Sequence, residues 1–321
     1  MSSRRTTRRG FLAGATAVGG LAVAGLGLNV VRGDHTWIER ESPTGSTLYG
    51  ATAAGESLFA VGGDGLLERT DVGWQFVDGD GLVGSNTTLR AVAPTDDGTG
   101  LWVVGTGGTI GVYDRARGVL DRYDLAGLLG LDQTLYDVAV TGPLGDERVV
   151  ASTTDGDVVV GTQGLLGRWW TTVATGGGQT VTGVDRHSES TGHAVGRGGT
   201  VFRTTDGGDS WTRVGLPDFD TVLYDVVSSP DRVHVAAENG RLFRLDCDCG
   251  LWTPVKAGAK GIRALTASAD GLLGAGENSQ IFEFVDNEWT SHDTSAGTTL
   301  LGVARGRVDV AVGSGGRIVE R

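Results

Sequence analysis

Short segments in which apolar and polar residues alternate recur along most of the chain, and residues 180–214 contain the clearest copy. In it, an alternating segment at 193–196 precedes a Gly198-Gly199 pair, a second alternating segment follows, and a last segment begins at Trp211. A period of two residues is typical of β-strands, and paired glycines adopt the positive φ angles of tight hairpins. With the short apolar run that opens it, this copy predicts four antiparallel strands.

The pattern occurs seven times. The first strand of each copy begins with an apolar residue, a variable one, a small one and another apolar one, starting at Leu48, Leu89, Leu135, Val181, Leu223, Ile262 and Leu300. Successive copies lie 38 to 46 residues apart. Strand-like repeats of this length predict a β-propeller, because each four-stranded unit buries both faces only by stacking on its neighbours. We therefore expect an all-β, seven-bladed β-propeller of four-stranded antiparallel blades.

The two ends of the repeat region complement each other. The seventh copy, from Thr299, stops at Arg321 after three strands, and a Trp-led segment at 37–40 precedes the first copy without belonging to it. Pairing these two segments removes open sheet edges that invite aggregation. We expect the N-terminal strand to close the last blade.

Composition and net charge suit an all-β fold and argue against one class of binding partner. Glycine supplies 56 of 321 residues, which suits many tight turns, and 27 basic against 39 acidic residues give a net charge of −12. Only Lys256 and Lys260 are lysines, and this Asp-rich, Lys-poor composition is similar to that of proteins from salt-loving archaea. Binding to phosphate backbones needs a basic stripe, so nucleic acid is not expected as a partner.

The first 33 residues have the order basic, apolar, polar that is typical of an export signal. Segment 7–12, which includes Arg8 and Arg9, resembles a twin-arginine motif. Cleavage after the Ala22-Val23-Ala24 triplet and retention as a membrane anchor both remain open, since the apolar run is just long enough to span a bilayer. We expect a signal or anchor at 1–33, a propeller at 34–321, and a location that is extracellular or on the outer face of the cytoplasmic membrane.

A turn in the clearest copy carries a recognisable motif. Thr204, Asp206, Gly208 and Trp211 match the Asp-box, or bacterial neuraminidase repeat, in which the aspartate accepts backbone N–H bonds across a hairpin and the tryptophan packs beneath it. With the repeated units, this motif makes residues 36–321 resemble the Asp-box propellers related to the photosystem II assembly and stability factor family. That resemblance implies a propeller whose Asp-box is structural, and it leaves function open between assembly factors and sialidase-like enzymes.

The variable position of the innermost strands is the candidate ligand site. Tyrosine or arginine occupies it in most copies, and the full set is Tyr49, Arg90, Tyr136, Thr182, Tyr224, Arg263 and Leu301. We predict that the three tyrosines and two arginines converge at the mouth of the central channel and bind a carboxylate, a sugar acid or an acidic peptide. The alternative is that they pack between blades, with the arginines paired to acids.

The sequence supports catalysis and metal binding less strongly than it supports a ligand site. Asp137 and Asp225 occupy equivalent positions in the third and fifth copies, and such a pair is the weak alternative for glycoside hydrolysis. His193 and His234 align with apolar positions of other copies, which predicts core histidines. His35, His187 and His292 lack metal-ligand spacing, so we expect no metal and no cofactor.

Cys247 and Cys249 are the only cysteines of the chain. In an exported protein such a pair is free to form a strained, redox-active disulfide, and two free thiols or a simple loop staple are the alternative.

These patterns favour an exported, monomeric, non-enzymatic scaffold that binds a protein or peptide, membrane-associated or not. A carbohydrate-active hydrolase or lyase is the second hypothesis.

Overall fold

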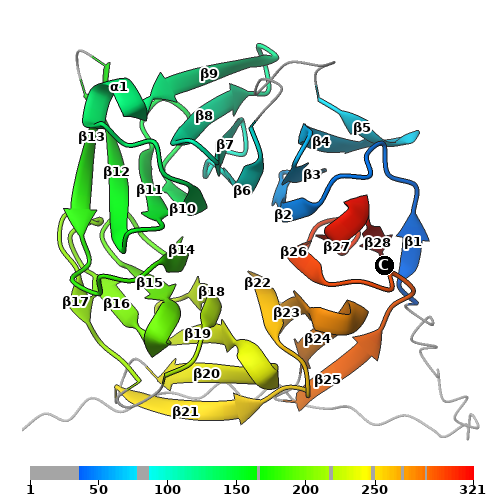
Figure 1. Ribbon diagram of the computed structural model, residues 1–321. Helices are drawn as coiled ribbons and strands as arrows, with labels where there is room; N and C mark the ends of the chain where they lie inside the picture. Colours follow the sequence, from blue (N-terminus) through cyan, green and yellow to red (C-terminus); the bar gives the residue numbers. More distant parts are fainter. Residues whose placement is uncertain are drawn as a thin grey trace, which may run out of the picture. The chain divides into compact units, whose positions relative to one another are not determined.

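The computed structural model describes residues 36–77, 87–164, 167–216, 220–246, 250–268, 271–285 and 288–321. Within the compact unit Thr36–Arg321, seven four-stranded antiparallel sheets form a ring (Figure 1). We number these blades 1 to 7 in chain order. The expected fold class is therefore confirmed.

In blades 1 to 6 the strands follow one another in chain order from the centre of the ring outward. Blades 1 to 3 consist of β2 (Leu48–Ala54), β3 (Ser57–Gly62), β4 (Gly65–Thr70), β5 (Gly73–Phe76); β6 (Leu89–Pro94), β7 (Gly100–Gly105), β8 (Thr109–Asp114), β9 (Val119–Asp124); and β10 (Leu135–Thr141), β11 (Arg148–Thr153), β12 (Asp157–Gly164), β13 (Gly167–Ala174). A short helix, α1 (Leu125–Leu129), follows β9.

The remaining blades repeat this order. Blades 4 to 6 consist of β14 (Val181–Arg186), β15 (Gly192–Gly196), β16 (Val201–Thr204), β17 (Thr212–Arg213); β18 (Leu223–Ser228), β19 (Arg232–Ala237), β20 (Arg241–Asp246), β21 (Leu251–Lys256); and β22 (Ile262–Ser268), β23 (Gly271–Gly276), β24 (Gln280–Val285), β25 (Glu288–Asp293). Blade 7 combines β26 (Leu300–Ala304), β27 (Val310–Gly313) and β28 (Ile318–Glu320) with β1 (Ile38–Arg40).

The N-terminal strand closes the ring as expected. β1 pairs antiparallel with β28, the last strand of the chain, and the side chain of Trp37 is 6% exposed. Its ring lies under the Arg321 guanidinium, 5.1 Å from it. The closing segment thus supplies both a strand and a core residue.

The second strand of each blade forms the core between blades. Phe59, Trp102 and Leu273 occupy the same register position on these strands and are fully buried. His193 and His234 take this position in blades 4 and 5 and are 2% and 9% exposed, which confirms them as core residues.

Candidate functional site

A β-bulge interrupts the innermost strand of every blade at the variable position. In blade 1, Leu48 pairs with Gly62 and Gly50 pairs with Val61, so Tyr49 has no partner of its own. The register shifts at the same place in the other six blades, at the positions of Arg90, Tyr136, Thr182, Tyr224, Arg263 and Leu301. Bulges re-aim side chains and are common beside binding sites. The bulge explains why this residue is free to vary.

Blades 1 to 3 bring three of these side chains into one stack. The guanidinium carbon of Arg90 lies 4.2 Å from the ring centroid of Tyr49 and 4.9 Å from that of Tyr136. All three residues are half-buried. Among the described residues, no acid forms an ion pair with Arg90. The stack therefore holds a guanidinium that stacks on two rings and forms no ion pair with any described acid.

Blades 5 and 6 hold a second arginine differently. The Arg263 guanidinium lies 4.0 Å from the Tyr224 ring centroid, and its Nη2 donates to Glu277 Oε1 at 2.6 Å. That hydrogen bond is the main cause that lowers the pKa of Glu277. Of the two arginines, Arg263 follows the alternative of pairing with an acid, whereas Arg90 does not. The sequence had not singled out Glu277, because its turn is separate from the strand that carries Arg263.

Two members of the ring contribute no charge. The Thr182 hydroxyl donates to the Leu223 carbonyl of blade 5 at 2.6 Å and so seals two blades together. Leu301 is half-buried. The five tyrosine and arginine side chains therefore form two separate groups, one on blades 1 to 3 and one on blades 5 and 6. Within the described part of the chain, only the second group contains an ion pair.

Asp137 and Asp225 bridge neighbouring blades through their carboxylates. Asp137 accepts the N–H groups of Val138 at 2.9 Å and of Val184, in blade 4, at 2.8 Å. Asp225 accepts those of Val226 and of Leu265, in blade 6, both at 2.7 Å. Burial raises the pKa of Asp137 to about 6 and raises that of Asp225 well above its ordinary value. Each of the four carboxylate oxygens already accepts a hydrogen bond from a backbone N–H group. Catalysis by this pair stays a prediction.

A third carboxylate of this kind was missed in the sequence. Asp185 accepts the N–H groups of Arg186 at 2.8 Å and of Ser228, in blade 5, at 2.7 Å. Burial raises its pKa to about 7. The position of Asp185 holds an uncharged residue in the other six copies, so a charged residue there is a signal that the sequence contains. Blades 3 to 6 are thus joined in series by the carboxylates of three half-buried aspartates.

Histidines near this bridge share one hydroxyl. Nδ1 of His187 and Nδ1 of His193 both lie 2.8 Å from Ser228 Oγ. Burial lowers the pKa of His193 to about 4, so the ring is neutral at physiological pH. Among the described residues, no group of three or more histidines, cysteines or acids is placed to hold a metal ion.

Hydrogen bonds hold together the turn that contains Thr204, Asp206, Gly208 and Trp211. Asp206 Oδ1 accepts the Ser210 N–H at 2.9 Å, and Thr204 Oγ1 accepts the Gly208 N–H at 2.8 Å. Trp211 Nε1 donates to the Gly208 carbonyl at 3.1 Å. The Ser210 hydroxyl is the main cause that lowers the pKa of Asp206 to about 2. This turn lies on the outer half of blade 4, away from the central stack.

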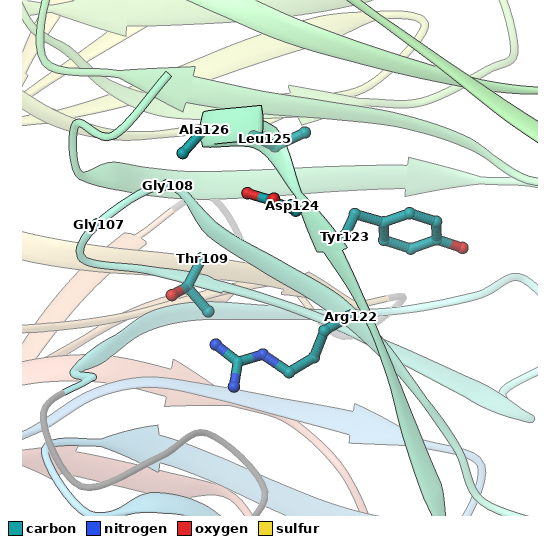
Figure 2. Close-up of a pocket in the computed structure, with 8 residues that line it drawn as sticks. All are labelled: Gly107, Gly108, Thr109, Arg122, Tyr123, Asp124, Leu125 and Ala126. Carbon is teal, nitrogen blue, oxygen red and sulfur yellow. The ribbon is translucent and has the colours of Figure 1, made fainter. Parts of the chain in front are cut away.

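A pocket of about 290 Å³ lies at the periphery of blade 2, between the Gly107-Gly108 turn and the end of β9. In Figure 2 the Asp124 carboxylate points toward that turn, while the Tyr123 ring points away from it. Asp124 Oδ1 accepts the Gly127 N–H at 2.9 Å and so caps α1. The acid of this pocket therefore serves the fold, and the central stack remains the better candidate for ligand binding.

Some sequence predictions lie outside the described residues. These are the export signal or anchor at 1–33 and the state of Cys247 and Cys249. In the part of the chain that the structure describes, no helix has the length and apolar character needed to cross a membrane.

Fold and site together define a seven-bladed β-propeller with a tyrosine-arginine stack at its centre. No protein-family model and no curated protein matches the chain. Solved structures match its fold. YCF48 bound to D1 peptide aligns at a TM-score of 0.67 and 17% identity, over 88% of this chain and 94% of that one.

Two further structures give the same result. YCF48 from Cyanidioschyzon merolae aligns at a TM-score of 0.66 and 17% identity, over 89% of this chain and 98% of that one. A chain of the mitotic checkpoint complex aligns at 0.72 and 12% identity, over 97% and 99%. Identities this low show the fold alone.

Proposed function

We propose that this propeller is a binding scaffold that captures a carboxylate-bearing segment of a protein partner at the centre of the ring. The observation that carries the proposal is the Arg90 guanidinium, which is held between the Tyr49 and Tyr136 rings without an acid partner among the described residues. A fixed guanidinium binds carboxylates with directed, charge-assisted hydrogen bonds. The peptide in the structure of YCF48 bound to D1 peptide supports a peptide as the ligand class.

The aromatic walls explain why arginine is needed at position 90. Stacking on two rings removes rotamer freedom from the guanidinium before a ligand arrives, which lowers the entropic cost of binding. Arg263 is less suited, because Glu277 already neutralises it. The proposal therefore assigns the two arginines unequal roles.

The test compares three single substitutions that remove the same charge. Capped synthetic peptides that differ only in the presence of carboxylates are titrated against the full chain and its variants. We expect the acidic peptides to bind, Arg90→Gln to weaken that binding by about tenfold or more, and Arg263→Gln to have a smaller effect. Arg213→Gln, on the exposed strand β17, is the matched control.

Equal affinities for Arg90→Gln and Arg213→Gln would contradict the assignment, and so would a parent chain that does not distinguish acidic from neutral peptides.

We further propose that the scaffold belongs to the Asp-box propellers and works outside the cytoplasmic membrane of a salt-loving organism, as a monomer. The Thr204–Asp206 turn, the pair Arg8-Arg9 and the net charge of −12 support these parts. Replacing Arg8 and Arg9 by lysine should leave the chain inside the cell when fractions are compared.

A further inference from the structure

The outermost strand of blade 3 differs from the other outer strands. β13 runs for eight residues, and the six residues of 169–174 contain neither a charge nor a proline. Arg168 is its one charged residue, and its side chain is 2% exposed because it pairs with Glu147. An exposed strand of this composition is a template for pairing with another strand.

The other outer strands carry features that block such pairing. Three of them are short, β5 with four residues, β1 with three and β17 with two. The longer ones and β1 contain charges or proline, at Glu39, Arg40, Asp121, Arg122, Asp124, Pro254, Lys256, Glu288 and Asp293. Natural proteins protect sheet edges by these means. Their absence from β13 singles it out.

The outer edge of β13 is open in the described part of the molecule. β13 pairs along its whole length with β12, and no backbone hydrogen bond joins it to any other described segment, including the neighbouring helix α1. Thr171 and Thr172, at its centre, are exposed. Figure 1 shows β13 on the outside of its blade. Alternate residues of this strand therefore direct unpaired N–H and C=O groups outward.

Trp169 adds an apolar surface to this edge. Its side chain is 67% exposed, and a Cβ atom at Gly164 would come within 2.7 Å of its Nε1. The indole therefore lies on the glycine backbone with its other face open. The neighbouring Trp170 packs inward against Trp102 and Tyr123, whereas Trp169 stays on the surface.

We infer that β13 is a docking edge that binds an extended segment of a partner protein as an added strand. The free backbone groups pair with that segment, and an apolar side chain of the segment rests on Trp169. Uncharged residues suit the middle of the segment, because the facing residues of β13 are uncharged.

The net charge of the chain favours a different protein, and not a second copy of this chain, as the partner that binds β13. Each copy carries −12, so two copies repel one another. Asp157, which pairs with Ala174 at the end of β13, is close enough to Asp155 for that charge to raise its pKa, although burial is the larger cause. Two carboxylates at this end favour a lysine or arginine at the matching end of the segment.

The test uses a capped peptide in which valine and threonine alternate between terminal lysines. On binding to the full chain, we expect slower hydrogen exchange at the outward amides of 168–174. A lysine at the centre of the edge, Thr171→Lys, should weaken binding by about tenfold or more, and Trp169→Ala should also weaken it. Thr253→Lys adds the same charge to an exposed position of β21 and should leave binding unchanged.

Several results would overturn the inference: no binding of the peptide, no protection of β13, or equal affinity for Thr171→Lys and Thr253→Lys. A concentration-dependent dimer that Thr171→Lys abolishes would instead show a second copy as the occupant. This edge is independent of the central stack, so Arg90→Gln should leave binding of this peptide intact.

Discussion

At the scale of single residues, Arg90 and Arg263 occupy equivalent bulges and differ in what surrounds them. Both stack on tyrosine, but a glutamate from a neighbouring turn reaches only Arg263. Among the described residues, the same repeat position thus carries an arginine without an acid partner in one blade and an ion-paired arginine in another. The half-buried aspartates also differ between blades, since the position of Asp137 and Asp225 holds glycine or alanine in the other blades.

Asp185 predicts a pH dependence of stability. Burial raises its pKa from 3.8 to about 7, so the folded chain holds the proton more tightly than the unfolded chain. This contribution to stability is present below about pH 4 and is lost as the pH rises to about 7. Asp185→Asn should reduce the loss of stability between about pH 5 and pH 8 by about 2 to 3 kcal/mol. Thermal unfolding midpoints at both pH values measure it.

Asp231→Asn, in the exposed turn after β18, is the control for this effect. If both variants showed the pH dependence of the parent chain, the titrating group would lie elsewhere.

At the scale of elements, the interface between blades 2 and 3 contains a buried ion pair. Arg168 on β13 and Glu147 are both 2% exposed and lie 2.7 Å apart, and the guanidinium also lies 4.8 Å from the Trp102 ring centroid. Gly145 donates its N–H to the other glutamate oxygen at 2.6 Å. Such a network places β13 against the neighbouring blade and leaves its outer edge free.

Glu147→Gln should destabilise the chain by about 3 to 5 kcal/mol, because it leaves the Arg168 charge buried without a counter-charge. Glu56→Gln is the matched control, since Glu56 and Arg307 are 85% and 75% exposed and 3.7 Å apart. We expect at most about 1 kcal/mol there. Urea unfolding of both variants measures the difference, and equal losses would contradict a structural role for the buried pair.

At the scale of the whole molecule, closure of the ring depends on contacts that the last strand, β28, makes with β1 and with blade 1. Glu320 receives hydrogen bonds from Arg40 at 3.0 Å, from Arg69 at 2.7 Å and from Trp74 Nε1 at 2.9 Å. These partners come from the closing strand and from blade 1. One buried carboxylate therefore joins both sides of the closure.

Deleting residues 36–42 should lower the thermal unfolding midpoint by about 10 °C or more, since it removes β1 and the buried Trp37 and leaves Glu320 without Arg40. A chain that begins at residue 34 is the control and keeps the closure. An unchanged midpoint in the deletion would show that the ring is held by other contacts.

Much of the fold was predictable because its signals are local. Alternation defines strands, and turn residues such as Asn239 and Gly240 adopt the left-handed conformation, with φ of 60° and 66°, that their sequence indicates. The core position of His193 followed from its alignment with apolar residues in other copies. For the candidate site, the sequence indicated which residues lie on the innermost strands around the centre, because they occupy the same position in each repeat.

Whether an acid pairs with each arginine of the site was decided by the tertiary structure. Arg90 and its two tyrosines come from three blades, and whether an acid reaches the guanidinium depends on turns that the repeat does not specify. The open edge of β13 has the same origin, because an edge is free only when no other segment covers it. By itself, the sequence determined seven blades and their strand order, since those follow from local periodicity. It also determined their closure, since the last copy lacks a strand that the segment before the first copy supplies. Only the packing of blades decided which charge stays available, because electrostatic compensation is a property of neighbours in space.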